Sequence, residues 1–173
     1  VLLLGAGPMS MLWLQVLRHG NASQIVVTDL YPSRLEAARE FGASDVVVAD
    51  ESQEERLREV SPRGFDIVID VTGVPKVLEA GFKYVKPMGK LMAFGVCPMN
   101  SSISVNPFEI YNKDITILGS MAINYTFEQA VELAEAGVVD LRSLVSHTFP
   151  LEEFERALQT AGTQASMKVQ VNP

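Results

Sequence analysis

The chain has 173 residues, a formal net charge of −7, and a composition that is 47% hydrophobic and 20% charged. This composition is typical of a globular domain with a substantial core, and the acidic balance, without a basic arm or stripe, argues against nucleic acid or an anionic membrane as the main partner. No apolar run approaches the ~20 residues that cross a membrane, and the single cysteine, Cys97, excludes an internal disulfide and favours a reducing, cytoplasmic location.

The first twenty residues carry the most specific pattern. An apolar strand over residues 1–4 is followed by Gly5-Ala6-Gly7-Pro8-Met9-Ser10 and then by an apolar run with helical spacing. Strand, glycine turn and helix form the context in which G-x-G-x-x-G indicates dinucleotide binding. Gly5 permits the tight turn, Gly7 lets a pyrophosphate approach the backbone, and Ser10 occupies the third position, which must be small. Pro8 suits the first helical turn, whose free N–H groups would face the pyrophosphate.

Strands and helices alternate along the rest of the chain. The predicted strands cover residues 24–29, 45–49, 65–71, 89–96 and 115–119, and the predicted helices cover residues 32–41, 51–60, 74–85, 127–136 and 151–161. Residues 107–112 are predicted to form one helical turn, and residues 103–105 and 168–171 to be extended. Residue Val1 already belongs to the first strand and no initiator Met precedes it, so we expect the chain to be one domain, residues 1–173, of a longer protein.

The strands are nearly continuous apolar runs, which predicts a parallel sheet covered on both faces. With a glycine turn after the first strand, the expected fold is α/β, a doubly wound, six-stranded Rossmann sheet in the order 3-2-1-4-5-6. Ligand would bind at the carboxyl ends of the strands, across the switch between the first and the fourth. Those ends carry residues 5–10, Asp29, Thr72-Gly73, Gly95-Val96 and residues 119–121.

Asp29 ends the second strand, 19 residues after Ser10, near the offset at which an acidic residue binds the adenosine ribose. A helix cap is the alternative role. The 2′-phosphate of NADP would meet this carboxylate at a repulsion of ~1–4 kcal/mol, so the sequence favours NAD. Arg34 could pair with a 2′-phosphate, but with Asp29 present we expect it to contact Asp29 or the adenosine end; a solvated helix residue is the alternative.

Residues for catalysis are scarce. His19 is expected at a helix end, His147 lies before the last helix, and Cys97 reads as a small apolar filler. We find neither metal-ligand spacing nor a nucleophile–base set. The sequence thus indicates a cofactor site without catalytic residues or a metal.

Several motifs in order carry a family resemblance. GAGP (5–8), DLYPSRLEAAREFGA (29–43), DVTG (70–73), GKLMAFGV (89–96), ITILGS (115–120) and LVSHTFPLEEFERAL (144–158) resemble the coenzyme domain of medium-chain, zinc-dependent alcohol dehydrogenases, above all the sorbitol and threonine dehydrogenase branch. The resemblance covers essentially the whole chain.

The resemblance implies roles for fourteen residues. Gly5, Gly7, Pro8 and Met9 would flank the pyrophosphate, Asp29 and Arg34 would hold the adenosine ribose, Thr72 and Gly73 would line the cleft, Phe94, Gly95 and Val96 would reach the nicotinamide through their backbone, and Ser120, Met121 and Ala122 would close over the nicotinamide end. In this family the segment matching residues 103–105 pairs with its two-fold mate, which implies a homo-oligomer.

The resemblance also implies hydride transfer between a secondary alcohol or polyol and NAD in the parent enzyme, with zinc polarising the alcohol. The domain that binds this zinc lies outside the chain, so we expect these 173 residues to bind NAD without turnover. Ser10 departs from the family's third glycine and is expected to weaken cofactor binding modestly. A nicotinamide-sensing regulatory module is an alternative, although it leaves the later motifs unexplained. A methyltransferase is disfavoured because leucines, not an acid, precede the glycine turn.

Overall fold

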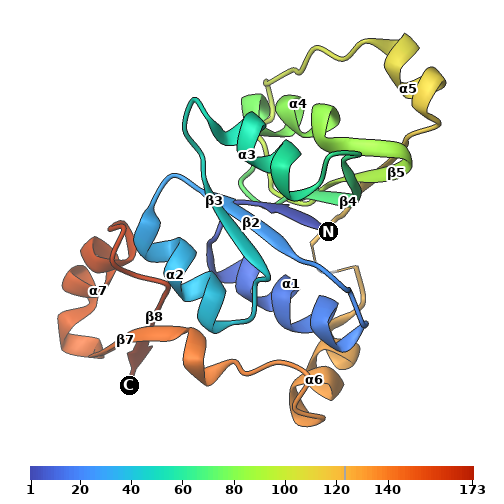
Figure 1. Ribbon diagram of the computed structural model, residues 1–173. Helices are drawn as coiled ribbons and strands as arrows, with labels where there is room; N and C mark the ends of the chain where they lie inside the picture. Colours follow the sequence, from blue (N-terminus) through green and yellow to red (C-terminus); the bar gives the residue numbers. More distant parts are fainter. Residues whose placement is uncertain (123) are drawn as a thin grey trace.

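A computed structural model describes residues 1–122 and 124–173. Its centre is a six-stranded parallel sheet in the order β3-β2-β1-β4-β5-β6, which confirms the predicted topology (Figure 1). The strands are β1 (Leu2–Leu4), β2 (Val26–Asp29), β3 (Asp45–Val48), β4 (Phe65–Asp70), β5 (Val85–Ala93) and β6 (Thr116–Gly119).

Helices cover both faces of the sheet. They are α1 (Pro8–His19), α2 (Pro32–Glu40), α3 (Gln53–Val60), α4 (Pro75–Tyr84), α5 (Pro107–Lys113), α6 (Phe127–Glu135) and α7 (Phe154–Ala161). Four of them, α1, α2, α4 and α5, begin at a proline. Proline is accepted there because the first N–H of a helix has no partner within the helix.

Two hydrophobic cores follow from the alternation of side chains along β1. Leu2 and Leu4 pack into one cluster with residues of α3 and α4, whereas Leu3 packs into the other with residues of α1 and α2. Figure 1 shows α1 and α2 on one side of the sheet and α3 and α4 on the other. Because both faces of β1 are buried, packing holds this strand and its carboxyl end firmly in position.

The C-terminal part differs from the prediction. Residues of β7 (Val145–Pro150), for which the sequence predicts no strand, pair in parallel with β8 (Lys168–Asn172) in a separate two-stranded sheet. The 3-10 turn η1 (Arg142–Leu144) precedes β7. The predicted helix over 151–161 is divided into a second 3-10 turn, η2 (Leu151–Glu153), and α7. Polar residues such as His147 give β7 the pattern of a loop, since a two-stranded sheet leaves much of its surface in water.

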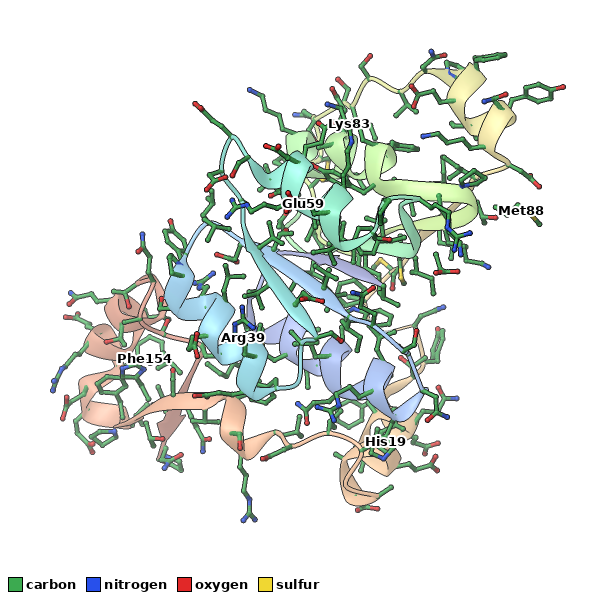
Figure 2. All side chains as sticks on the ribbon, viewed as in Figure 1. His19, Arg39, Glu59, Lys83, Met88 and Phe154 are labelled. Carbon is green, nitrogen blue, oxygen red and sulfur yellow. The ribbon has the colours of Figure 1, made fainter. Side chains whose placement is uncertain are left out.

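The strand predicted over residues 89–96 begins earlier, at Val85, and ends at Ala93. Its pairing with β4 shifts between Phe65 and Ile67, and Met88 has a positive φ of 61° at this irregularity. Figure 2 shows Met88 projecting from the outer end of β5. Pro87 and Gly89 obscure this part of the strand in the sequence because both residues are rare in strand interiors.

The segment 103–105 is not assigned as a strand in the described structure. Ile103 and Val105 pack against the core, and the Ser104 N–H donates to the Glu79 carboxylate at 2.8 Å. Beyond β5, all residues of β6 are exposed and α6 contains no buried residue. Within the described ranges, no helix combines the length and apolar character needed to span a bilayer.

Candidate functional site

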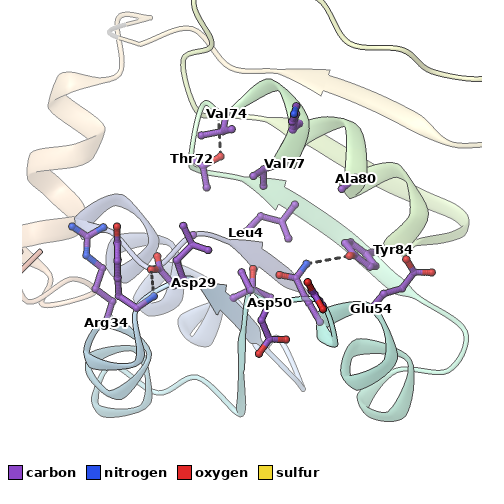
Figure 3. A pocket seen from close by; sticks show the side chains of 18 residues that line it. Leu4, Asp29, Arg34, Asp50, Glu54, Thr72, Val74, Val77, Ala80 and Tyr84 are labelled. Atoms are coloured by element: carbon purple, nitrogen blue, oxygen red, sulfur yellow. Dashed lines mark hydrogen bonds between the residues drawn. The ribbon is translucent and has the colours of Figure 1, made fainter.

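A cavity of about 530 Å³ opens at the carboxyl ends of β1, β2 and β4 (Figure 3). Four of the predicted site residues line it: Gly5, Asp29, Arg34 and Thr72. The remainder of its wall comes from the β3–α3 connection and from α4. The cavity therefore lies where the switch in strand order predicts a ligand site.

Gly5 is required by the fold itself. Its φ is +104°, and a Cβ at this position would lie 2.8 Å from the Thr72 Cγ2 atom. The Gly5 N–H donates to the Thr28 carbonyl at 2.8 Å, so the turn leaves β1 directly against β2. A side chain would meet both an unfavourable backbone conformation and a steric clash.

Unlike Gly5, Gly7 is not required by the backbone conformation or by the packing around it. Its φ of −79° is open to any residue, and a Cβ built on it would have no atom of the chain within 4 Å. Gly7 is the N-cap of α1 without a side-chain cap, and in the described part of the chain neither its N–H nor that of Met9 has a hydrogen-bond partner. Pro8 between them has no N–H. These donors and the positive end of the α1 dipole form a site suited to an anion.

Ser10 is accommodated inside the turn. It is fully buried, and its Oγ donates to the Gly5 carbonyl at 2.6 Å. The hydroxyl that replaces the usual third glycine is therefore satisfied by the backbone. It is not among the residues that line the cavity.

Asp29 ties the glycine turn to the second strand. Its Oδ2 accepts from the Ala6 N–H at 2.8 Å, and its Oδ1 accepts from the Tyr31 N–H at 2.9 Å. A carboxylate oxygen has two lone pairs, so each oxygen can accept a further hydrogen bond from a ligand hydroxyl. The geometry combines a structural and a binding capacity in one side chain.

Arg34 lies at the same end of the cavity as Asp29 (Figure 3). Its guanidinium carbon lies 5.6 Å from the centroid of the Tyr31 ring, and its Nε is buried without a partner among the described residues. None of the ion pairs found within those residues joins Arg34 to Asp29. Of the two contacts expected for Arg34, with Asp29 or with the adenosine end, the ion pair with Asp29 is not formed and the guanidinium stacks on Tyr31 instead.

Asp70 belongs to the DVTG motif, from which the sequence assigns it no role. It is fully buried at the end of β4, and its carboxylate accepts from the Thr72 N–H at 3.0 Å, the Thr72 hydroxyl at 2.6 Å and the Gly73 N–H at 3.3 Å. The signal is present in the sequence, because an acid at the end of a buried central strand must find donors nearby. Asp70 fixes the turn whose Thr72 lines the cavity.

The ends of β4 and β5 are in close backbone contact. A Cβ on Gly73 would lie 2.5 Å from the Val96 carbonyl oxygen, and one on Gly95 would lie 2.1 Å from the Gly73 nitrogen. The structure brings these three predicted residues together just outside the cavity. Phe94 is directed elsewhere: its ring packs edge-on against Trp13, at 5.5 Å between centroids.

Ser120, Met121 and Ala122 follow β6 and are all exposed. The Ser120 N–H donates to the Ala93 carbonyl at 3.3 Å, which holds this segment beside β5. Since β5 separates β6 from β4, these three residues lie at the same edge of the sheet as the cavity but not in its wall.

The far end of the cavity is not indicated by the sequence. Gln53 and Tyr84 line it and are joined by a hydrogen bond of 3.0 Å from Gln53 Nε2 to the Tyr84 hydroxyl. Asp50 lies on the same wall, where the Ser52 hydroxyl, the Ser52 N–H and then Arg56 hold its pKa below the usual value. From their charge, residues 51–60 are expected to form a solvated surface. In the structure, the first turn of α3 lies against α4 and so forms part of the cavity wall.

The described residues contain no group of three or more His, Cys, Asp or Glu side chains placed to hold a metal ion. The lining of the cavity offers groups that recognise a ligand. It presents a carboxylate acceptor, a guanidinium donor, and the unpaired N–H groups of a helix N-terminus close by.

Comparison with known proteins gives consistent results. The family described as zinc-binding dehydrogenase matches residues 8–136. The chain is 29% identical over 177 residues to D-arabinitol dehydrogenase 1 of Uromyces fabae, covering 99% of the chain and 51% of that protein. It is 33% identical over 170 residues to D-altritol 5-dehydrogenase of Agrobacterium fabrum, covering 98% and 49%. The chain spans about half the length of these curated relatives.

Solved structures share the fold. The short chain alcohol dehydrogenase of Escherichia coli CFT073, complexed with NADH, superposes with a TM-score of 0.91 over 99% of this chain and 51% of its own, at 22% identity. At that level of identity the likeness extends to the architecture alone.

Proposed function

Because this chain belongs to the zinc-binding dehydrogenase family, we propose that residues 1–173 form the NAD-binding domain of an alcohol or polyol dehydrogenase. Both curated relatives described above are polyol dehydrogenases by name. Bound NAD supplies the acceptor for a hydride taken from a secondary alcohol. The chain's own residues bind the cofactor, orient it and keep one face of it away from water.

The observation that carries this proposal is Gly7. The fold gives no steric reason for glycine there, because an added Cβ would contact nothing. A ligand that must approach the backbone closely supplies the missing reason, and the unpaired N–H groups of Gly7 and Met9 suit a pyrophosphate. The cofactor therefore fits the residues that are present.

The remaining cofactor contacts follow from the cavity. Asp29 accepts hydrogen bonds from the adenosine ribose hydroxyls, and the Arg34 guanidinium lines the same end of the cavity, where its terminal N–H groups can donate. Thr72 lines the cavity, and Gly73 and the backbone at Phe94, Gly95 and Val96, just outside it, would lead towards the nicotinamide. The exposed segment of Ser120, Met121 and Ala122 closes the nicotinamide end.

The position of Asp29 favours NAD over NADP. Its carboxylate oxygens already accept two backbone N–H groups, which holds the charge in place beside the ribose. A 2′-phosphate at about 4 Å would be repelled by ~1–4 kcal/mol. NAD should therefore bind about five to several hundred times more tightly than NADP.

We further propose that the zinc of the family is held by the part of the parent protein outside this chain. The described residues contain no suitable ligand group, so the role of this domain in the reaction is to bind and orient the cofactor. The parent is proposed to be cytoplasmic, in keeping with the single Cys97.

A second copy of the chain is the proposed partner. Ile103 and Val105 turn inward against the core, while Ser104 is exposed and its N–H is held by Glu79. This extended segment has no strand partner in the described chain, and an unpaired edge of this kind favours pairing with its two-fold mate. Sedimentation of the chain and of the parent protein tests this part.

Calorimetric titration of the 173-residue chain with NADH and NADPH tests the proposed function. We expect saturable binding of NADH, weaker binding of NADPH, and no oxidation of an alcohol panel by the chain alone. Failure to bind NADH would refute the cofactor role. Turnover by the isolated chain would refute the proposal that catalysis needs the part of the parent protein outside this chain.

A further inference from the structure

A second hollow of about 150 Å³ lies on the other side of Glu54 and Tyr84, which line both this hollow and the larger cavity. It is formed by the end of α3, the turn from Ser61 to Gly64, the end of α4 and the beginning of β5, with Lys113 of α5 at its edge. Neither the sequence motifs nor the proposed cofactor site includes it.

The charge around this hollow is unusual for the chain. Arg58, Arg63, Lys83 and Lys113 line it, against the single carboxylate of Glu54. The whole chain has 14 Lys and Arg residues and a net charge of −7. Four cations gathered at one small hollow of an acidic protein repel one another and concentrate a positive potential there.

The cations are only partly neutralised within the protein. Glu54 Oε1 pairs with Arg58 Nη2 at 2.5 Å, and Glu54 Oε2 pairs with Lys83 Nζ at 3.4 Å. Arg63 and Lys113 take part in none of the ion pairs found within residues 1–122 and 124–173. Glu54 thus pairs with two of the four cations, Arg58 and Lys83. Four cations against one carboxylate leave the lining of the hollow with a net charge of +3.

The hollow is small, at about 150 Å³. This volume has room for one tetrahedral oxyanion, so the choice of ligand rests on the charge of the lining. Arginine offers a planar pair of N–H donors and lysine a point charge, a combination that suits phosphate oxygens. Lys113 of α5 is half-buried, whereas Lys83 of α4, which is labelled in Figure 2, is exposed and held only by its 3.4 Å pair with Glu54.

We propose that this hollow is a binding site for a phosphate group, separate from the dinucleotide site. Free inorganic phosphate and a phosphate ester share the chemistry that these side chains recognise. Binding relieves the mutual repulsion of Arg63 and Lys113 and adds a second anion beside Glu54.

Titration of the ¹⁵N-labelled chain with sodium phosphate, at constant ionic strength set with sodium chloride, tests the proposal. We expect saturating amide shifts over residues 61–65 and around Lys83, with half-saturation at roughly millimolar concentration because each exposed pair contributes little. Glycerol 3-phosphate in a parallel titration identifies the source, since the tighter of the two ligands is the natural class.

A matched pair of variants controls for charge. Arg63→Gln with Lys113→Gln should weaken phosphate binding about tenfold. Arg39→Gln with Lys168→Gln removes the same two charge types from exposed positions outside the hollow and should leave binding unchanged. Amide shifts that never saturate, or that occur at residues 5–10 instead, would overturn the proposal. An equal loss of phosphate affinity in the two double variants would also overturn it.

Discussion

Substitution of Gly7 by Ala separates cofactor binding from folding. An Ala at this position gains about 0.4–1 kcal/mol by restricting the unfolded chain, and it loses a comparable amount because Ala is a poorer N-cap than Gly. The φ of −79° and the absence of any atom within 4 Å of the new Cβ add no strain. We expect Tm to change by less than about 2 °C.

NADH affinity should respond very differently. Under the proposed function, the new methyl group would occupy the space through which a pyrophosphate oxygen reaches the N–H groups of Gly7 and Met9. A lost hydrogen bond to a charged group is worth about 1.5–3 kcal/mol, so NADH binding should weaken roughly 10- to 150-fold. Thermal melts followed by circular dichroism give the stability, and calorimetric titration gives the affinity.

Gly5→Ala is the matched control. Its φ of +104° and the distance of 2.8 Å from the new Cβ to Thr72 Cγ2 predict a loss of about 2–4 kcal/mol from backbone strain and overpacking, and a Tm lower by about 4–16 °C. The reasoning is refuted if Gly7→Ala binds NADH as tightly as the unmodified chain, or if it unfolds as readily as Gly5→Ala.

Three further outcomes follow from the same structure. Asp29→Ala should narrow the difference between NADH and NADPH affinity, and an unchanged ratio in paired titrations would contradict the assignment. Ser10→Ala leaves the partly buried Gly5 carbonyl without its 2.6 Å donor, so the free energy of unfolding in urea should fall by about 0.5–1.5 kcal/mol. The Ser143 hydroxyl, helped by nearby backbone N–H groups, holds the pKa of the Asp140 carboxyl below its ordinary value of 3.8. Its contribution is therefore complete above that value and is lost as the pH falls through the lowered one, so Asp140→Asn should lower Tm at pH 7 and differ progressively less from the unmodified chain below about pH 4.

The order of the sheet was predictable because local signals agreed with one another. Prolines begin four helices, and near-continuous apolar runs such as residues 65–71 occur only where a strand is covered on both faces. The weakest predictions concerned β7, whose polar residues are tolerated only because β8 pairs with it from more than 20 residues away. Pairing with a strand so far away in the sequence cannot be deduced from the hydrophobic pattern of residues 145–150 alone.

The residues of the site also differ in how far the sequence could predict them. Asp29 and Thr72 could be located from their offset after the glycine turn and from their position at strand ends. The wall formed by Gln53 and Tyr84 could not, because it exists only through the packing of α3 against α4. Arg34 could be identified as a residue of the site, yet its stacking on Tyr31 depends on how α2 leaves β2.

The glycines show why the structure adds to the motif. Most of the 12 glycines are explained by the chain itself, either by a positive φ or by a neighbour within 4 Å of the missing Cβ. Gly7 and Gly119 have neither. Gly7 begins the helix that would face the pyrophosphate, and Gly119 directly precedes Ser120, where the family resemblance implies the nicotinamide end. A glycine without a reason inside the chain is consistent with a ligand that needs the space, and under the proposed function these two positions would lie at the pyrophosphate and towards the nicotinamide.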